Sequence, residues 1–210
     1  LTADWVKLLM QMKASYKPDV ILIVFFLRDG TLTTIMESFY GPIRKEIKLR
    51  NKNSFLYQHA YLFRIIRDYL DRLYLSEKYS IRIRESYFGN PQQTMEWERA
   101  KSNILKINSI AKEIHAKVGL VVYPILVELN QNYPFKDVCD RIMNFGTEHH
   151  IPDLSLLPAF MGKNAPDLWV SAYNQHPNEQ AHLIVANSVL PFLRDLLISL
   201  GVGYDHQPER

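Results

Sequence analysis

The chain has 210 residues, of which 47% are hydrophobic, 12% aromatic and 22% charged, as in a folded globular protein and unlike a disordered or collagen-like chain. Its length suits a single α/β domain, and its one cysteine, Cys139, excludes an internal disulfide. Lys and Arg (25) exceed Asp and Glu (22) by only three, too few and too dispersed for a nucleic-acid-binding surface.

The first part of the chain predicts a helix followed by a buried strand. Residues 3–15 carry apolar side chains at spacings of three and four, which is typical of a helix. The continuous apolar run of residues 20–27 is typical of a strand covered on both faces. It is the longest apolar run and has only eight residues, so we expect no membrane span. The turn Arg28-Asp29-Gly30 follows at the carboxyl end of this strand, where open α/β sheets place their ligand sites.

A long helical stretch comes next. In residues 54–75 one helical face is apolar and the opposite face is charged, which predicts a helix packed against the core. The apolar face consists of Leu62, Ile66, Tyr69, Leu70 and Leu73, and the charged face of Arg64, Arg67, Asp68 and Asp71. Residues 76–91 are polar, aromatic and interrupted by Gly89, so we expect an irregular loop that could serve as a lid.

A basic run precedes this helix. It consists of Arg44, Lys45, Lys48, Arg50 and Lys52 and predicts an exposed helix face, although an anionic headgroup or polymer substrate would also suit it.

The second half alternates helices and strands. We expect a helix in residues 94–117, a second buried strand in residues 119–127 and a helix in residues 135–149. A short strand is expected in residues 151–157 and a long helix in residues 177–200. This alternation predicts a parallel sheet in one domain over residues 1–210, with a tail at residues 201–210.

The tripeptide His176-Pro177-Asn178 is the most informative motif. Pro177 suits the first turn of a helix, so His176 is expected at or just before the helix start, with its ring edge exposed in a loop-lined cleft. Taken alone, the tripeptide fits a helix-cap histidine equally well, and Arg28-Asp29-Gly30 alone is also an ordinary charged turn.

Taken in order, these blocks resemble the SGNH (GDSL-type) hydrolases. The blocks are the strand ending in Arg28-Asp29-Gly30, the strand Val-Val-Tyr-Pro-Ile and the helix start at His176, and together they span residues 16–192. The resemblance implies a three-layer α/β/α, flavodoxin-like fold. It also implies an ester hydrolase that needs no cofactor and acts on lipid, small-molecule or carbohydrate esters through a serine nucleophile.

The resemblance also implies roles for four residues. His176 is similar to the general base, and Asn174 stands where relatives carry the Asp that orients the imidazole. A neutral amide cannot stabilise an imidazolium, so Asp167 or a Ser–His dyad are alternatives. Arg28 stands at the position of the family's oxyanion-binding Asn, and the role is kept because a guanidinium also donates to an oxyanion. Asp29 is expected to support the loop.

The nucleophile itself is missing from the pattern. The family's Gly-Asp-Ser block is absent, and none of the twelve serines is predicted on a strand-to-helix elbow; Ser171 is the nearest to His176 in sequence. We expect the first strand and its serine upstream of Leu1, which would leave about three of the family's five strands and an unpaired sheet edge. A missing N-terminal segment or a homo-oligomer would cover that edge.

Two other functions compete with hydrolysis: a non-catalytic module that binds a ligand or partner, and an O-acetyltransferase of related fold. No metal site is expected, because His149-His150 and Asp153 lack ligand spacing. Cys139 is expected in the core, and His182 is expected to pack on or bond to the sheet. A single cysteine suits the cytoplasm, the periplasm or secretion alike.

Overall fold

The structure, a computed structural model, describes residues 2–13, 15–31, 33–171 and 174–201, with residues 33–40 described by their backbone. By internal contacts the chain forms two compact units. One comprises Leu1–Asp29 and Glu98–Arg210, and the other comprises Gly30–Trp97. We call the first the α/β unit and the second the helical unit. The tail expected at residues 201–210 lies outside the described residues from residue 202 onward.

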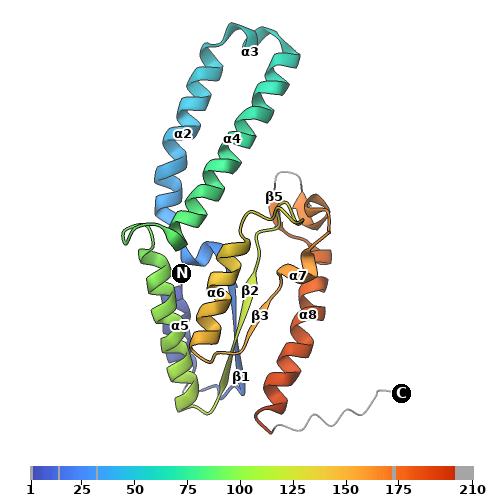
Figure 1. Cartoon of the computed structure of the whole chain (residues 1–210). Helices are drawn as coiled ribbons and strands as arrows, with labels where there is room; N and C mark the ends of the chain where they lie inside the picture. Colours follow the sequence, from blue (N-terminus) through green and yellow to red (C-terminus); the bar gives the residue numbers. More distant parts are fainter. Residues whose placement is uncertain (1, 14, 32, 172–173, 202–210) are drawn as a thin grey trace, which may run out of the picture. The chain divides into compact units, whose positions relative to one another are not determined.

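A small parallel sheet forms the centre of the α/β unit (Figure 1). It contains β1 (Val20–Phe26), β2 (Lys117–Tyr123) and β3 (Asp153–Ser155) in the order β1-β2-β3. β1 and β2 pair along their whole length, and β3 pairs only with the second half of β2. The predicted mixed α/β class and parallel sheet are therefore confirmed.

Helices contact both faces of this sheet. The helices of the unit are α1 (Thr2–Met12), α5 (Met95–Glu113), α6 (Lys136–Glu148), α7 (Leu157–Phe160) and α8 (Glu179–Ile198). On one face, Trp5 of α1 meets Phe25 of β1 edge to face, with ring centroids 6.3 Å apart. On the opposite face, a Cβ on Gly119 of β2 would lie 2.7 Å from Cδ1 of Leu196 in α8. Gly119 thus allows α8 to approach the sheet closely.

The helical unit contains α2 (Thr33–Asn53), α3 (Phe55–His59) and α4 (Tyr61–Phe88). Its structure corrects the prediction of an irregular lid at residues 76–91, because α4 continues to Phe88. Ile83 and Tyr87, one turn apart, are buried, and the Ser86 hydroxyl donates to a carbonyl four residues earlier. Helical spacing therefore persists through this polar, aromatic segment.

A second correction concerns the first half of α4. The apolar side chains that were expected to pack against a core are exposed instead, with Leu62 at 69% and Ile66 at 50% exposure. The helix is amphipathic as predicted, but no described residue covers its apolar face.

The C-terminal helix begins later than expected. Pro177 precedes it, and Asn178 caps α8 by accepting the backbone N–H of Ala181 at 3.1 Å. Among the described helices, only α8 is long and apolar enough to cross a membrane by length and composition. That is a weak indication, because core helices of soluble proteins meet the same criterion. The absence of a membrane span therefore stays a prediction.

Replacing Gly119 with Val tests the close approach of α8 to the sheet. The added side chain would collide with Leu196 and Phe192, so we expect the free energy of unfolding in urea to fall by about 1–3 kcal/mol. Gly41→Val is the matched control, because a Cβ at Gly41 meets no atom within 4 Å. An equal loss in both variants would contradict close packing at Gly119.

Candidate functional site

The segments that carry the predicted site residues follow the carboxyl ends of the strands. β1 and β2 end side by side, with Phe26 opposite Tyr123. Arg28 and Asp29 follow β1 directly in a short 3-10 helix, η1 (Leu27–Gly30). Because parallel strands end at the same edge, the turns after β1 and β2 lie together there.

A two-stranded hairpin carries His176 to this edge. It consists of β4 (Trp169–Ser171) and β5 (Asn174–Pro177), which pair antiparallel. The indole N–H of Trp169 donates to the carbonyl of Leu126, just beyond β2, at 2.8 Å. This bond ties the start of the hairpin to the carboxyl end of the central strand.

The hairpin was not predicted from the sequence. Each strand has only three or four residues, too few for a period of two to stand out. His176 lies in β5, three residues before α8, and its side chain is exposed. The prediction that Pro177 opens the helix is wrong, because Pro177 ends β5.

Asn174 makes a different contact from the one expected of it. Its side-chain oxygen accepts the backbone N–H of His176 at 3.2 Å, and its own backbone N–H donates to Oγ of Ser171 at 3.1 Å. The amide oxygen therefore holds the hairpin backbone in place of the predicted contact with the imidazole. Ser171 is likewise part of this turn.

Asn178 is the positioning residue that sequence reasoning missed. Besides capping α8, its side-chain N–H groups donate to the carbonyls of Asp167 at 2.8 Å and Trp169 at 3.2 Å. Its backbone N–H donates to the carbonyl of Leu168 at 2.9 Å. One side chain thus joins α8, β4 and the 3-10 helix η2 (Ala165–Leu168). The sequence did contain a signal for the capping role, because an Asn directly before an apolar helix is a favoured N-cap.

Asp29 holds the turn after β1. Its carboxylate accepts the backbone N–H of Phe26 at 2.9 Å. Burial raises the pKa of Asp29 above its usual value, with the Phe26 hydrogen bond acting in the opposite direction. Arg28, in the same turn, has an exposed side chain. The turn therefore presents a guanidinium at the sheet edge while Asp29 fixes its backbone.

Tyr123 adds a buried hydroxyl to the same edge. Its ring stacks on Phe26 with centroids 4.3 Å apart. Its hydroxyl oxygen is buried and has no hydrogen-bond partner among the described residues. Burial raises the pKa of Tyr123 to about 12, so the hydroxyl stays protonated and can donate. The sequence carried no signal that Tyr123 would present a buried hydrogen-bond donor.

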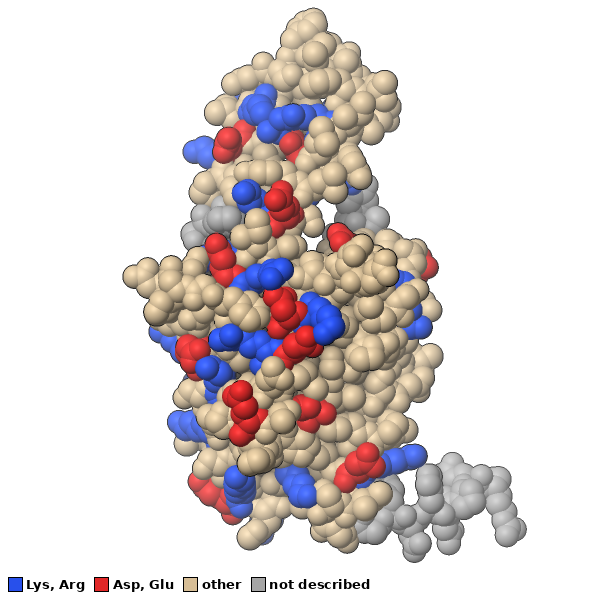
Figure 2. All heavy atoms as spheres, in the orientation of Figure 1, with Lys and Arg blue, Asp and Glu red and all other residues tan. Residues whose placement is uncertain are grey.

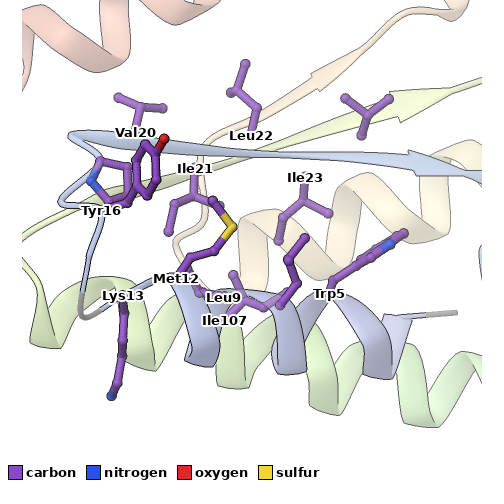
Figure 3. A pocket seen from close by; sticks show the side chains of 13 residues that line it. Trp5, Leu9, Met12, Lys13, Tyr16, Val20, Ile21, Leu22, Ile23 and Ile107 are labelled. Carbon is purple, nitrogen blue, oxygen red and sulfur yellow. The ribbon is translucent and has the colours of Figure 1, made fainter.

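An apolar cavity of about 460 Å³ lies along β1 (Figure 3). Leu9 and Met12 of α1 face Ile21 and Ile23 of β1 across it. Lys13 is the one charged residue among those that line it, and its ammonium is 3.1 Å from Glu113. The cavity therefore suits an apolar occupant.

Beside this cavity, β1 presents an open strand edge. β1 is the outer strand of the described three-stranded sheet. The Lys117 N–H donates to the carbonyl of Asp19, so the backbone groups of odd-numbered residues face β2. The backbone N–H and C=O groups of Val20, Leu22 and Val24 then point away from the sheet. An added strand could pair along this side.

The remaining chemically active residues form no further site among the described residues. In the part of the chain that the structure describes, no cluster of three His, Cys, Asp or Glu could hold a metal. Asp153 accepts the Thr147 hydroxyl at 3.4 Å. Cys139 is buried as predicted, and burial raises its pKa to about 12. His182, expected on the sheet, is exposed on α8.

No protein-family model, curated protein or solved structure matches this chain. Function therefore rests on its own residues and their geometry.

The bonds of Asn178 can be tested by Asn178→Ala. Losing the cap and two carbonyl contacts should lower the free energy of unfolding in urea by about 2 kcal/mol. Asn164→Ala is the matched control. Asn164, like Asn178, stands directly before a helix, here η2, but its side chain makes no capping hydrogen bond. Its effect should stay within about 0.5 kcal/mol. Equal effects would show that Asn178 does not hold these elements together.

Asp29→Asn tests the burial of the carboxyl group, because Asn keeps an oxygen for the Phe26 N–H and removes the charge. The folded state holds the Asp29 proton more tightly than the unfolded chain, since its pKa is raised above the usual 3.8. Ionisation therefore costs stability as the pH rises through the raised value. We expect the variant to gain stability relative to wild type as the pH rises from about 4, and the gain to become constant once the pH exceeds the raised pKa, as measured in urea titrations. A pH-independent difference would contradict this assignment.

Proposed function

We propose that this chain is the main part of an SGNH-type ester hydrolase, with the three-layer, flavodoxin-like arrangement of that family. The supporting observation is that the Arg28 turn and the His176 hairpin are both fixed at the carboxyl edge of one parallel sheet. The Asp29–Phe26 bond fixes the turn and the Trp169–Leu126 bond fixes the hairpin. Open α/β sheets place their chemistry at this edge.

In this proposal His176 acts as general base. Its neutral imidazole takes the proton of a serine hydroxyl as the serine oxygen attacks the ester carbonyl carbon, and the guanidinium of Arg28 donates to the developing oxyanion. The ester C–O bond then breaks, and His176 returns the proton to the leaving alcohol. Water, deprotonated by the same imidazole, then attacks the acyl carbon; the acyl–Oγ bond breaks, the carboxylic acid is released and the imidazolium returns the proton to the serine oxygen. No cofactor takes part.

In this proposal the nucleophilic serine lies on a further strand, which pairs in parallel with the open edge of β1. The outward backbone groups of Leu22 and Val24 offer hydrogen bonds to such a strand, and the apolar cavity beside them offers burial for its side chains. A parallel neighbour of β1 would end beside Arg28, which is where the nucleophile is needed.

A second candidate is a non-catalytic module that binds an apolar ligand. The observation that favours it is the cavity along β1, whose lining is almost wholly apolar. Asn174 also fits this alternative, because its amide holds the hairpin backbone and supplies no charge to an imidazolium.

His176→Ala tests the hydrolase proposal. In the longest natural form of the protein, turnover of short p-nitrophenyl esters should fall at least about 100-fold, because general-base catalysis is lost. His182→Ala is the matched control, since His182 is another exposed histidine and lies on α8. Its turnover should match wild type.

Two results would contradict the proposal: unchanged turnover in His176→Ala, or no ester turnover together with no serine labelled by a fluorophosphonate probe. The second result, accompanied by saturable binding of a fatty acid in the cavity, would favour the binding module.

A further inference from the structure

Polar side chains join the helices of the helical unit to one another. Between α2 and α4, the side chain of Asn51 donates to the carboxylate of Asp71 at 2.9 Å, and Arg50 donates to the same carboxylate. Asn51 and Asp71 are both buried. Burial opposes ionisation of Asp71, but the bonds from Asn51 and Arg50 outweigh it and lower its pKa. The two helices are therefore joined by an ionic hydrogen-bond network.

A second polar contact joins α3 to α4. The Tyr57 hydroxyl donates to Asp68 at 2.6 Å. Asp68 and Asp71 belong to the charged face of α4, so that face is turned toward α2 and α3. The apolar face of α4, on the opposite side of the helix, is left to the outside.

The helices α2 and α4 form a helical hairpin, whose tip around α3 is apolar, aromatic and free of Lys, Arg, Asp and Glu. Residues 53–63, which include α3 and the start of α4, contain no Lys, Arg, Asp or Glu. Phe55 is 73% exposed, Tyr61 70% and Leu62 69%. Large apolar side chains exposed together at one place indicate an interaction surface. We call residues 53–63 the apolar tip.

Basic residues flank the apolar tip on both helices. From residue 44 to residue 72 the chain has eight Lys and Arg against three Asp and Glu. Figure 2 shows the tip without charged atoms on the face in view, above a band that contains Lys and Arg together with some Asp and Glu. This basic collar consists of Arg44, Lys45, Lys48 and Lys52 on α2 and Arg64 and Arg72 on α4. Arg50 and Arg67 are left out of it, because both pair with the buried carboxylate of Asp71.

We propose that the apolar tip docks into the surface of an anionic lipid bilayer, with the basic collar against the headgroups. Aromatic and aliphatic side chains enter the interface, Tyr and Phe rings favour the headgroup level, and Lys and Arg are attracted to anionic lipid. A second copy of the chain is a poorer occupant. Pairing two tips would cover the apolar side chains but would bring two basic collars together. This surface is independent of the proposed hydrolysis.

Co-sedimentation of the full chain with vesicles tests the proposal. We expect binding to phosphatidylcholine vesicles containing 30% phosphatidylserine to exceed binding to pure phosphatidylcholine vesicles by about tenfold or more. Phe55→Ala/Leu62→Ala should lower binding to the anionic vesicles about tenfold. Lys48→Gln/Lys52→Gln should do the same and should leave a weaker dependence on salt.

Matched controls use exposed residues of the α/β unit. Leu183→Ala/Ile198→Ala removes exposed apolar side chains from α8, and Lys106→Gln/Lys112→Gln removes exposed charges from α5. Both control variants should bind like wild type. An equal loss in the α8 variant would overturn the proposal and assign the lipid contact to α8.

A tryptophan at the tip provides a readout that does not depend on loss of binding. The sequence has Trp only at residues 5, 97 and 169, so Phe55→Trp places a reporter at the tip. Brominated anionic lipids should quench this variant more strongly than wild type. Equal quenching would overturn the proposal. A dimer detected by light scattering would also overturn the proposal if it depends on the tip residues and binds no vesicles. That result would assign the apolar tip to contact with a second copy of the chain.

Discussion

The pairing of β2 with two neighbours is the constraint on which the α/β unit depends. β2 is buried from Val118 to Tyr123 and is bonded on both sides, to β1 and to β3. Every backbone polar group of a buried strand needs a partner, so its neighbours are held in one register. Because β1 and β2 end together, the turn of Arg28 and the hairpin of His176 share one edge. The site follows from the sheet and not from proximity in sequence.

The helical unit is organised by a different interaction, the hydrogen-bonded carboxylate of Asp71. A buried carboxylate without partners would cost several kcal/mol, so Asn51 and Arg50 must lie against it. That requirement turns the charged face of α4 inward. The apolar side chains of the same helix are then turned outward, which explains why a hairpin of ordinary amphipathic helices exposes phenylalanine, tyrosine and leucine.

Secondary structure was predictable where one period dominated a long segment. The strand predicted from the apolar run of residues 20–27 and the helix expected in residues 94–117 correspond to β1 and α5. The prediction of a loop in residues 76–91 is wrong because polar and aromatic composition alone does not exclude a helix, and Ile83 and Tyr87 keep the helical spacing. The β4–β5 hairpin was missed because its stability comes from the tertiary contacts of Trp169 and Asn178 and not from strand propensity.

The sequence by itself determined several of the longer elements, the parallel sheet and the residues that bear reactive groups, because apolar periodicity and the residue types at strand ends are local properties. Only the tertiary structure decided which face of α4 is inside, that Asn174 bonds to the backbone of its own hairpin, and that an apolar cavity lies along β1. These features depend on which groups meet across the chain. Burial and hydrogen bonding between distant residues decide them, and neither can be read from local spacing.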